Sequence, residues 1–211
     1  LLSLARSAWQ ADGHKVHGLA LAGKAVDGLE GSSGIPSRTL ASLEAYWANG
    51  HEPVPQNSIV VMDEVGMVGT RQLSRILSGL AERYCKVVLV GDPDQLQPIE
   101  AGTPFRDLIV RHEHAHLTEI RRQRESWQRE ASVELAQGNM REALAQYGTR
   151  GCISDHTHVD DAISALADDY VADIENRAAG RSRLALAHRR KDVFALNQAI
   201  RARLRTADSL S

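Results

Sequence analysis

Cysteine, aromatic residues and long apolar runs are all scarce in this sequence of 211 residues. The two cysteines, Cys85 and Cys152, are too few for a disulfide framework and lack the spacing of metal ligands. Aromatic residues make up only 4%, and helical spacing places Trp9 and Trp47 in packing rather than in base stacking. Because neither a signal peptide nor an apolar run of about 20 residues is present, we expect a cytoplasmic protein without a membrane segment.

An excess of charge of one sign is lacking as well. The 25 basic residues are balanced by 27 acidic ones, which gives a formal net charge of −2. No global positive field draws such a chain to nucleic acid or to anionic lipid, so any nucleic-acid binding must be local. The hydrophobic share of 43% and the charged share of 25% are ordinary for a globular protein and exclude wholesale disorder.

The sequence begins with Leu1 rather than Met, and apolar residues already recur at helical spacing over residues 1–9. This helix should end at Asp12-Gly13, which is a turn signal. We therefore expect the chain to start inside a helix and to be a fragment of a longer protein.

Two apolar, β-branched runs in the centre of the chain predict neighbouring buried strands. They span Ser58–Asp63 and Lys86–Gly91, and residues 70–84 between them carry apolar side chains at helical spacing. A strand, a helix and a strand with short connections form a βαβ unit, whose two strands run parallel. The sequence therefore predicts an α/β fold built on a parallel sheet.

Further elements are predicted on both sides of this unit. A strand is expected over Lys15–Leu21, followed by a helix that Ser37 caps. The later part is predicted to be mostly helical, with helices over residues 124–137, 140–147 and 160–177, a strand over residues 182–187, and a last helix that contains residues 193–204.

Polar residues follow both central strands, at the edge where an open parallel sheet binds its ligands. The first strand ends in Asp63-Glu64, and the second leads into Gly91-Asp92-Pro93-Asp94-Gln95. Adjacent carboxylates suit nucleotide hydrolysis, because one can hold hydrated Mg²⁺ on the phosphates while the next orients the attacking water. Gln95 would then reach the terminal phosphate. The alternative is structural: Asp63 caps the following segment, and Gly91-Asp92-Pro93 is only a turn.

A nucleotide site of this kind needs a phosphate-binding loop, G-x-x-x-x-G-K-[ST], and the chain offers only an incomplete match. Residues Gly18–Ala25 fit the pattern except at the end, where Ala25 cannot ligate Mg²⁺. The four intervening residues are apolar and predict a strand, whereas the cradle is a loop of exposed backbone N–H groups. We therefore expect the phosphate loop to precede Leu1.

Three ordered motifs resemble those of the RecD-like branch of superfamily-one DNA helicases, and especially the helicase region of TraA/TraI-type conjugative relaxases. They are residues 63–67 (DEVGM), residues 91–102 (GDPDQLQPIEAG) and residues 117–123 (LTEIRRQ). Residues 34–40 (GIPSRTL) and 121–128 (RRQRESWQ) resemble sequences particular to the conjugative group. The resemblance spans essentially the whole chain and is most specific between residues 58 and 129.

The resemblance implies a role for each matching residue. Asp63-Glu64 corresponds to a pair in which Asp63 coordinates Mg²⁺ through a water molecule and Glu64 activates the attacking water. Gly91-Asp92 and Gln95 correspond to the motif that senses the γ-phosphate of ATP and couples it to DNA. Arg122 corresponds to an arginine finger, which neutralises charge in the transition state, and Arg121 is the weaker candidate.

The same resemblance implies contacts with single-stranded DNA. Gly23-Lys24 and Ser37-Arg38-Thr39 correspond to segments that grip the DNA backbone. Members of the family usually carry a hydroxyl residue just before this glycine, whereas this chain has Ala22, which cannot supply that contact with phosphate. Backbone N–H groups and Lys24 could still serve.

By this resemblance, the chain is part of a P-loop ATPase of RecA-like fold. Residues 1–116 would form most of a first RecA-like domain, and residues 117–211 the arginine-finger segment, a helical connection and the start of a second. In the parent protein, ATP and Mg²⁺ would bind between the two domains and drive movement along the plasmid strand that is transferred, with relaxosome proteins as partners. The isolated chain is expected to be inactive.

Two alternatives stay open. One is a RecD-like repair helicase without a relaxase, and the sequence before Leu1 would decide, since a relaxase has a tyrosine nucleophile and a three-histidine metal site. The other is a vestigial helicase domain that only binds single-stranded DNA. The intact set of Asp63, Glu64, Gln95 and Arg122 argues against it, because a binding protein does not need hydrolytic residues.

Three clusters allow more than one interpretation. His112, His114 and His116 alternate and could hold a metal from one face of a strand, but an exposed loop is favoured because no Cys or structured carboxylate joins them. The basic residues of Arg121–Arg129 form either a local DNA-binding cluster or a solvated helix face. The basic residues of Arg181–Lys191 form a second cluster, for which lining a DNA channel and having no DNA contact are equally open interpretations.

Overall fold

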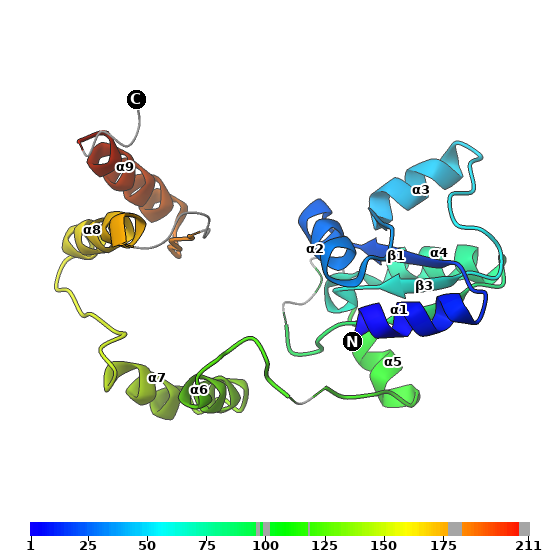
Figure 1. Cartoon of the computed structure of the whole chain (residues 1–211), viewed down its shortest axis with the longest axis horizontal. Coiled ribbons are helices and arrows are strands. Elements are labelled where there is room, and N and C mark those ends of the chain that lie inside the picture. The colour runs from blue at the N-terminus through cyan, green and yellow to red at the C-terminus, as the bar shows by residue number, and fades with distance from the viewer. Residues whose placement is uncertain (96–97, 99–101, 118, 177–182, 207–211) are drawn as a thin grey trace. The chain divides into compact units, whose positions relative to one another are not determined.

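The computed structural model describes residues 1–95, 98, 102–117, 119–176 and 183–206. The chain forms two compact units, Leu1–Leu117 and Thr118–Ser211 (Figure 1). Part of the predicted second motif (residues 96–97 and 99–101) and Arg181 lie outside the described residues. None of the helices in the described ranges is long and apolar enough to cross a membrane.

A parallel sheet forms the centre of the first unit. In the part that the structure describes, its four strands are β1 (Val16–Ala20), β2 (Ser37–Thr39), β3 (Ile59–Met62) and β4 (Lys86–Leu89), in the order β2-β1-β3-β4. Each neighbouring pair of strands is parallel. The predicted βαβ unit is confirmed, because β3 and β4 are neighbours and α4 (Thr70–Ala81) connects them.

Helices cover both faces of this sheet, which is why its strands are apolar on both sides. Besides α4 they are α1 (Leu2–Ala11), α2 (Gly23–Ser33), α3 (Leu40–Ala48), the 3-10 helix η1 (Val65–Met67) and α5 (Pro104–Arg111). Val60 of β3 belongs to one buried cluster with side chains of α3, α4 and α5, and Val61 belongs to another, against which α1 packs. Trp9 and Trp47 pack against these clusters, as predicted.

The predicted helix cap at Ser37 is wrong. Ser37–Thr39 is strand β2, and Thr39 caps α3, because its hydroxyl accepts a hydrogen bond from the Ser42 amide at 3.1 Å. Both residues carry the hydroxyl that a cap requires. The pairing of Ser37 with Gly18 in the sheet decides between them.

The second unit is helical over most of its described length. α6 (Ser126–Ala136) packs against α7 (Met140–Gly148), and α8 (Val159–Asn176) packs against α9 (Arg190–Thr206). These helices match the predicted ones closely. The strand predicted over residues 182–187 is wrong where it is described, since residues 183–187 have no regular structure. A strand needs a neighbour for its backbone groups, and no described strand pairs with this segment.

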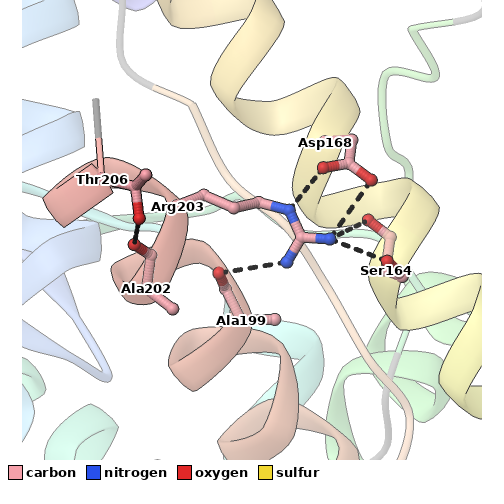
Figure 2. A network of polar contacts seen from close by, with 6 residues as sticks. All are labelled: Ser164, Asp168, Ala199, Ala202, Arg203 and Thr206. Carbon is pink, nitrogen blue, oxygen red and sulfur yellow. Dashed lines mark hydrogen bonds and ion pairs between the residues drawn. The ribbon is translucent and has the colours of Figure 1, made fainter.

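Arg203 of α9 ties the α8–α9 pair together (Figure 2). Its guanidinium donates to the Asp168 carboxylate, to the Ser164 hydroxyl at 2.7 Å and to the Ser164 carbonyl at 3.2 Å. The hydrogen bond from Arg203 holds the pKa of Asp168 below its ordinary value. The network therefore favours the ionised carboxylate and links α9 to α8 at the protein surface.

Candidate functional site

The carboxyl ends of the central strands meet at one edge of the sheet. The register pairs Met62, the last residue of β3, with Leu19 of β1 and with Leu89 of β4. Asp63 and Gly91, which follow β3 and β4, therefore lie at the same edge. This is the edge at which open parallel sheets bind their ligands.

Asp63 is fixed at this edge by its backbone and by its side chain. Its amide donates to the Leu19 carbonyl at 2.9 Å, and its Oδ1 accepts a hydrogen bond from the Glu64 amide at 2.9 Å. The half-buried Asp63 thus shapes the turn after β3, as the structural alternative expects. Among the described residues, Oδ2 has no partner, so one carboxylate oxygen remains to bind a ligand.

Glu64 occupies the sharpest point of this turn. Its backbone is left-handed, with φ 56° and ψ 34°, which is uncommon for a residue other than glycine. The helix η1 follows at once, and the Val65 amide donates to the Val90 carbonyl at 3.1 Å. Backbone strain of this kind persists only where neighbouring contacts hold it, and it is concentrated at functional sites. The turn leaves Glu64 exposed to solvent, while the bond from Val65 anchors the turn to Val90, the residue that follows β4.

Two glycines let this turn pack directly on the segment that follows β4. A Cβ on Gly66 would lie 2.6 Å from the backbone oxygen of Asp92, and a Cβ on Gly91 would lie 3.0 Å from the Gly66 nitrogen. A side chain at either position would push the two segments apart. The packing brings together four of the predicted nucleotide-site residues: Asp63, Glu64, Gly91 and Asp92.

The loop that carries Gln95 is shaped by hydrogen bonds. Asp92 Oδ1 accepts from the Asp94 amide at 2.9 Å, which is the turn of the structural alternative. Arg106 of α5 donates from Nε to the Pro93 carbonyl at 2.7 Å, and Gln95 is exposed on this anchored loop. Sequence reasoning missed Arg106, because it lies outside the motif and its partner is a backbone carbonyl, which no sequence pattern reveals.

Gly23 and Lys24 are the first residues of α2, just after the carboxyl end of β1. Both are exposed, and Ala22 at the N-cap makes no side-chain capping bond. The start of the helix thus offers backbone amides and one ammonium group to an anion. The extended backbone over Val16–Ala20 confirms that the incomplete phosphate-loop match begins as a strand.

The residues of β2 are half-buried and engaged in internal contacts. The Ser37 hydroxyl donates to the Ile35 carbonyl at 2.7 Å, and Thr39 caps α3. The Arg38 guanidinium lies over the ring of Tyr46, 5.0 Å from its centroid. Among the described residues of β2, only Arg38 therefore carries a charged side chain that could attract a phosphate.

Arg121 and Arg122 differ in their surroundings. Arg121 donates from Nη2 to Glu119 Oε2 at 2.6 Å, and this hydrogen bond raises the pKa of Arg121. Arg122 is exposed and has no hydrogen bond or ion pair within the described residues. A guanidinium without a partner suits an arginine finger better than one already paired. Both residues belong to the second unit. The assignment of Arg122 to the same nucleotide site as Asp63 and Glu64 therefore rests on its sequence motif alone.

The histidine cluster lies in an exposed segment, which is the interpretation that the sequence favours. His112 ends α5, and His114 and His116 follow it in chain without regular structure. Over the described ranges, no group of three or more His, Cys, Asp or Glu side chains is arranged to hold a metal ion.

The basic stretch before α9 is partly neutralised. Arg183 pairs with Asp173 at 2.6 Å, and Arg189 pairs with Asp192 at 2.6 Å. Arg190 and the following Lys191 are exposed at the start of α9. These contacts give Arg183 and Arg189 structural partners, and the DNA-channel interpretation stays a prediction.

Replacing Gly66 with Ala is expected to lower the free energy of unfolding by about 1–3 kcal/mol, because the new methyl group overpacks a backbone contact. Gly28→Ala is the matched control, since a Cβ there meets nothing within 4 Å and alanine favours the interior of α2. Urea denaturation of both variants measures the difference. A Gly66→Ala variant as stable as the parent would mean that the two segments are not in contact.

Comparison with known proteins agrees with this geometry. A protein-family model described as an AAA domain matches residues 1–158. The chain is 42% identical over 204 residues to the conjugal transfer protein TraA of Agrobacterium fabrum, an alignment that covers 97% of this chain and 18% of the relative. It thus spans about a fifth of the length of that protein.

Shorter matches extend the comparison. The multifunctional conjugation protein TraI of Escherichia coli is 34% identical over 96 residues, which are 44% of this chain and 5% of TraI. The ATP-dependent RecD2 DNA helicase of Deinococcus radiodurans is 34% identical over 106 residues, which are 48% of this chain and 14% of the helicase. With its parallel sheet flanked by helices, the predicted P-loop NTPase fold class is confirmed. The chain therefore belongs to the AAA-domain family and is a homologue of the TraA and TraI conjugation proteins and of RecD helicases.

Proposed function

We propose that this chain is part of an ATP-driven motor that moves on single-stranded DNA during conjugative transfer. The observation that carries the proposal is the backbone contact between Val65-Gly66, which directly follow Asp63-Glu64, and the segment Gly91-Asp92 at the carboxyl edge of the sheet. A direct backbone contact lets a change in one segment displace the other. An acidic hydrolytic pair and a phosphate sensor need such coupling.

The acidic pair has the donor set that Mg²⁺ and ATP require. Asp63 offers one unpaired carboxylate oxygen, and Mg²⁺ is usually held by one or two carboxylates, waters and substrate phosphates rather than by a cage of protein ligands. When bound, the ion would neutralise phosphate charge. The exposed Glu64 carboxylate would accept a proton from water, and Gln95 on its anchored loop would contact the terminal phosphate.

We also propose that the phosphate-binding loop is not among these 211 residues. Gly18 and Leu19, the first two residues of the incomplete match, are paired on both sides in the sheet, so their backbone amides cannot cradle a phosphate. The isolated chain should then hydrolyse no ATP, whereas a longer protein that includes the loop should. Clear turnover by the isolated chain would show that residues 18–25 form the cradle after all.

For DNA, we propose that Lys24 and Arg38 contact the phosphate backbone. Lys24 is exposed at the start of α2, and Arg38 carries a charge on edge strand β2. Thr39 is proposed to donate its hydroxyl proton to a phosphate, because that hydroxyl only accepts a hydrogen bond within the chain, whereas the Ser37 hydroxyl already donates to Ile35, so Ser37 is proposed to act by positioning its neighbour Arg38. Two short contact segments would give local binding despite the net charge of −2.

We assign residues 1–116 to a first RecA-like domain and residues 117–211 to the arginine-finger segment, a helical connection and the start of a second domain. Arg122 would supply the positive charge that stabilises the transition state. Relaxosome proteins would be partners of the parent protein. A RecD-like repair helicase is the second candidate, which the match to RecD2 favours.

A strand-displacement assay on the full-length protein tests the motor directly. With ATP and Mg²⁺, it should release a labelled strand from a duplex that has a single-stranded tail, and ADP should support no release. Binding to the tail without release would favour the vestigial DNA-binding domain and contradict the motor. Repair and conjugative functions are separated by the upstream sequence, in which a relaxase carries a tyrosine nucleophile and three metal-binding histidines.

A further inference from the structure

Arg129 of α6 contacts the chain immediately after Arg122. Its Nη1 group donates two hydrogen bonds, to the Gln123 carbonyl at 3.0 Å and to the Arg124 carbonyl at 2.7 Å. Arg129 is half-buried, and it lines the same surface hollow as Arg121. One side chain therefore holds two successive backbone carbonyls of the segment that carries Arg122.

Few other described interactions fix the backbone conformation of this segment. Residues 119–125 form neither helix nor strand, so no regular backbone ladder fixes them. The ion pair between Arg121 and Glu119 is local and exposed, with side-chain exposures of 80% and 71%, so it adds little rigidity. Hydrogen bonds from a charged, planar guanidinium are stronger and more directional than neutral ones. The bonds from Arg129 are thus the main described restraint just beyond Arg122.

We propose that Arg129 is a positioning residue that holds Arg122 in the orientation needed for ATP hydrolysis. The inference rests on the proposed role of Arg122 as the arginine finger. Among the described residues, the hydrogen bonds of the Arg129 side chain go to backbone carbonyls of its own unit, so its assigned action is on the segment and not on the nucleotide. A displacement of about 1 Å at a catalytic group can lower a rate roughly a hundredfold, so a restraint at this point affects turnover.

The first test compares Arg129→Met, Arg129→Lys and the control Arg141→Met in the full-length protein. Arg141 is an exposed arginine on α7 without a described partner. In a steady-state ATPase assay with single-stranded DNA, Arg129→Met should lower kcat roughly ten- to hundredfold with KM for ATP within about twofold. Arg129→Lys should recover part of kcat, because Lys keeps the charge and can reach one carbonyl. Arg141→Met should leave kcat unchanged.

The second test is a double-mutant cycle with Arg122→Ala. If Arg129 acts through Arg122, then Arg129→Met or Arg129→Lys lowers kcat no further in the Arg122→Ala background. If Arg129 only stabilises the start of α6, each substitution lowers kcat by the same factor in both backgrounds, and the inference is overturned. Circular dichroism shows whether each variant folds. If Arg129→Met does not fold, Arg129→Lys takes its place in the cycle.

The outcomes also separate this inference from the proposed function. If Arg122→Ala lowers kcat and both Arg129 variants keep it within twofold of the parent, only the positioning role fails. If Arg122→Ala itself leaves kcat unchanged, the finger assignment fails and the positioning role fails with it.

Discussion

Glu64→Gln is expected to lower kcat for ATP hydrolysis by roughly 10²–10⁴-fold while ATP binding is retained. The substitution preserves the size and shape of the side chain but removes the group that accepts a proton from water. The turn should survive, because its hydrogen bonds run through the Asp63 carboxylate and through the backbone of Glu64 and Val65, not through the Glu64 side chain.

Steady-state hydrolysis and titration of a fluorescent ATP analogue, both in the full-length protein, measure the two effects separately. Glu82→Gln is the matched control, because Glu82 is an exposed glutamate at the end of α4 and away from the carboxyl edge. It should behave like the parent. Normal hydrolysis by Glu64→Gln would show that this carboxylate does not activate water.

Arg122→Ala is expected to lower kcat by roughly 10³–10⁵-fold, the range found for arginine fingers in phosphoryl transfer. The physical reason is the loss of a positive charge that stabilises the transition state and has no other partner among the described residues. KM for ATP should change little, since the interaction is made mainly in the transition state.

Arg121→Ala in the same protein is the neighbouring control. Its guanidinium is held by Glu119, so its loss should change kcat by no more than a few-fold. The reverse pattern, in which Arg121→Ala abolishes turnover and Arg122→Ala does not, would assign the finger to Arg121.

The centre of the fold was predictable because its signals are local. β3 and β4 are β-branched apolar runs, and α4 between them has apolar residues at helical spacing, so their order and parallel pairing follow from connection length. The placement of Asp63 and Gly91 at one edge follows from the same unit. No knowledge of distant contacts was needed for this part of the site.

Other features depend on partners distant in sequence. The choice between Ser37 and Thr39 as helix cap is decided by pairing with Gly18, and the role of Gly66 is decided by its approach to Asp92. Arg129 uses backbone carbonyls, which every residue possesses, so no sequence pattern marks it. The short apolar run at residues 184–187 resembles a strand, but a strand forms only with a partner for its backbone.

ATP hydrolysis by the full-length protein, measured with and without single-stranded DNA, tests the central claim most directly. If the acidic turn at Asp63-Glu64 and the segment Gly91–Gln95 couple nucleotide to DNA, the rate should rise severalfold on addition of a single-stranded oligonucleotide and should require Mg²⁺. A rate that is the same with and without DNA, or no hydrolysis under either condition, would contradict the account.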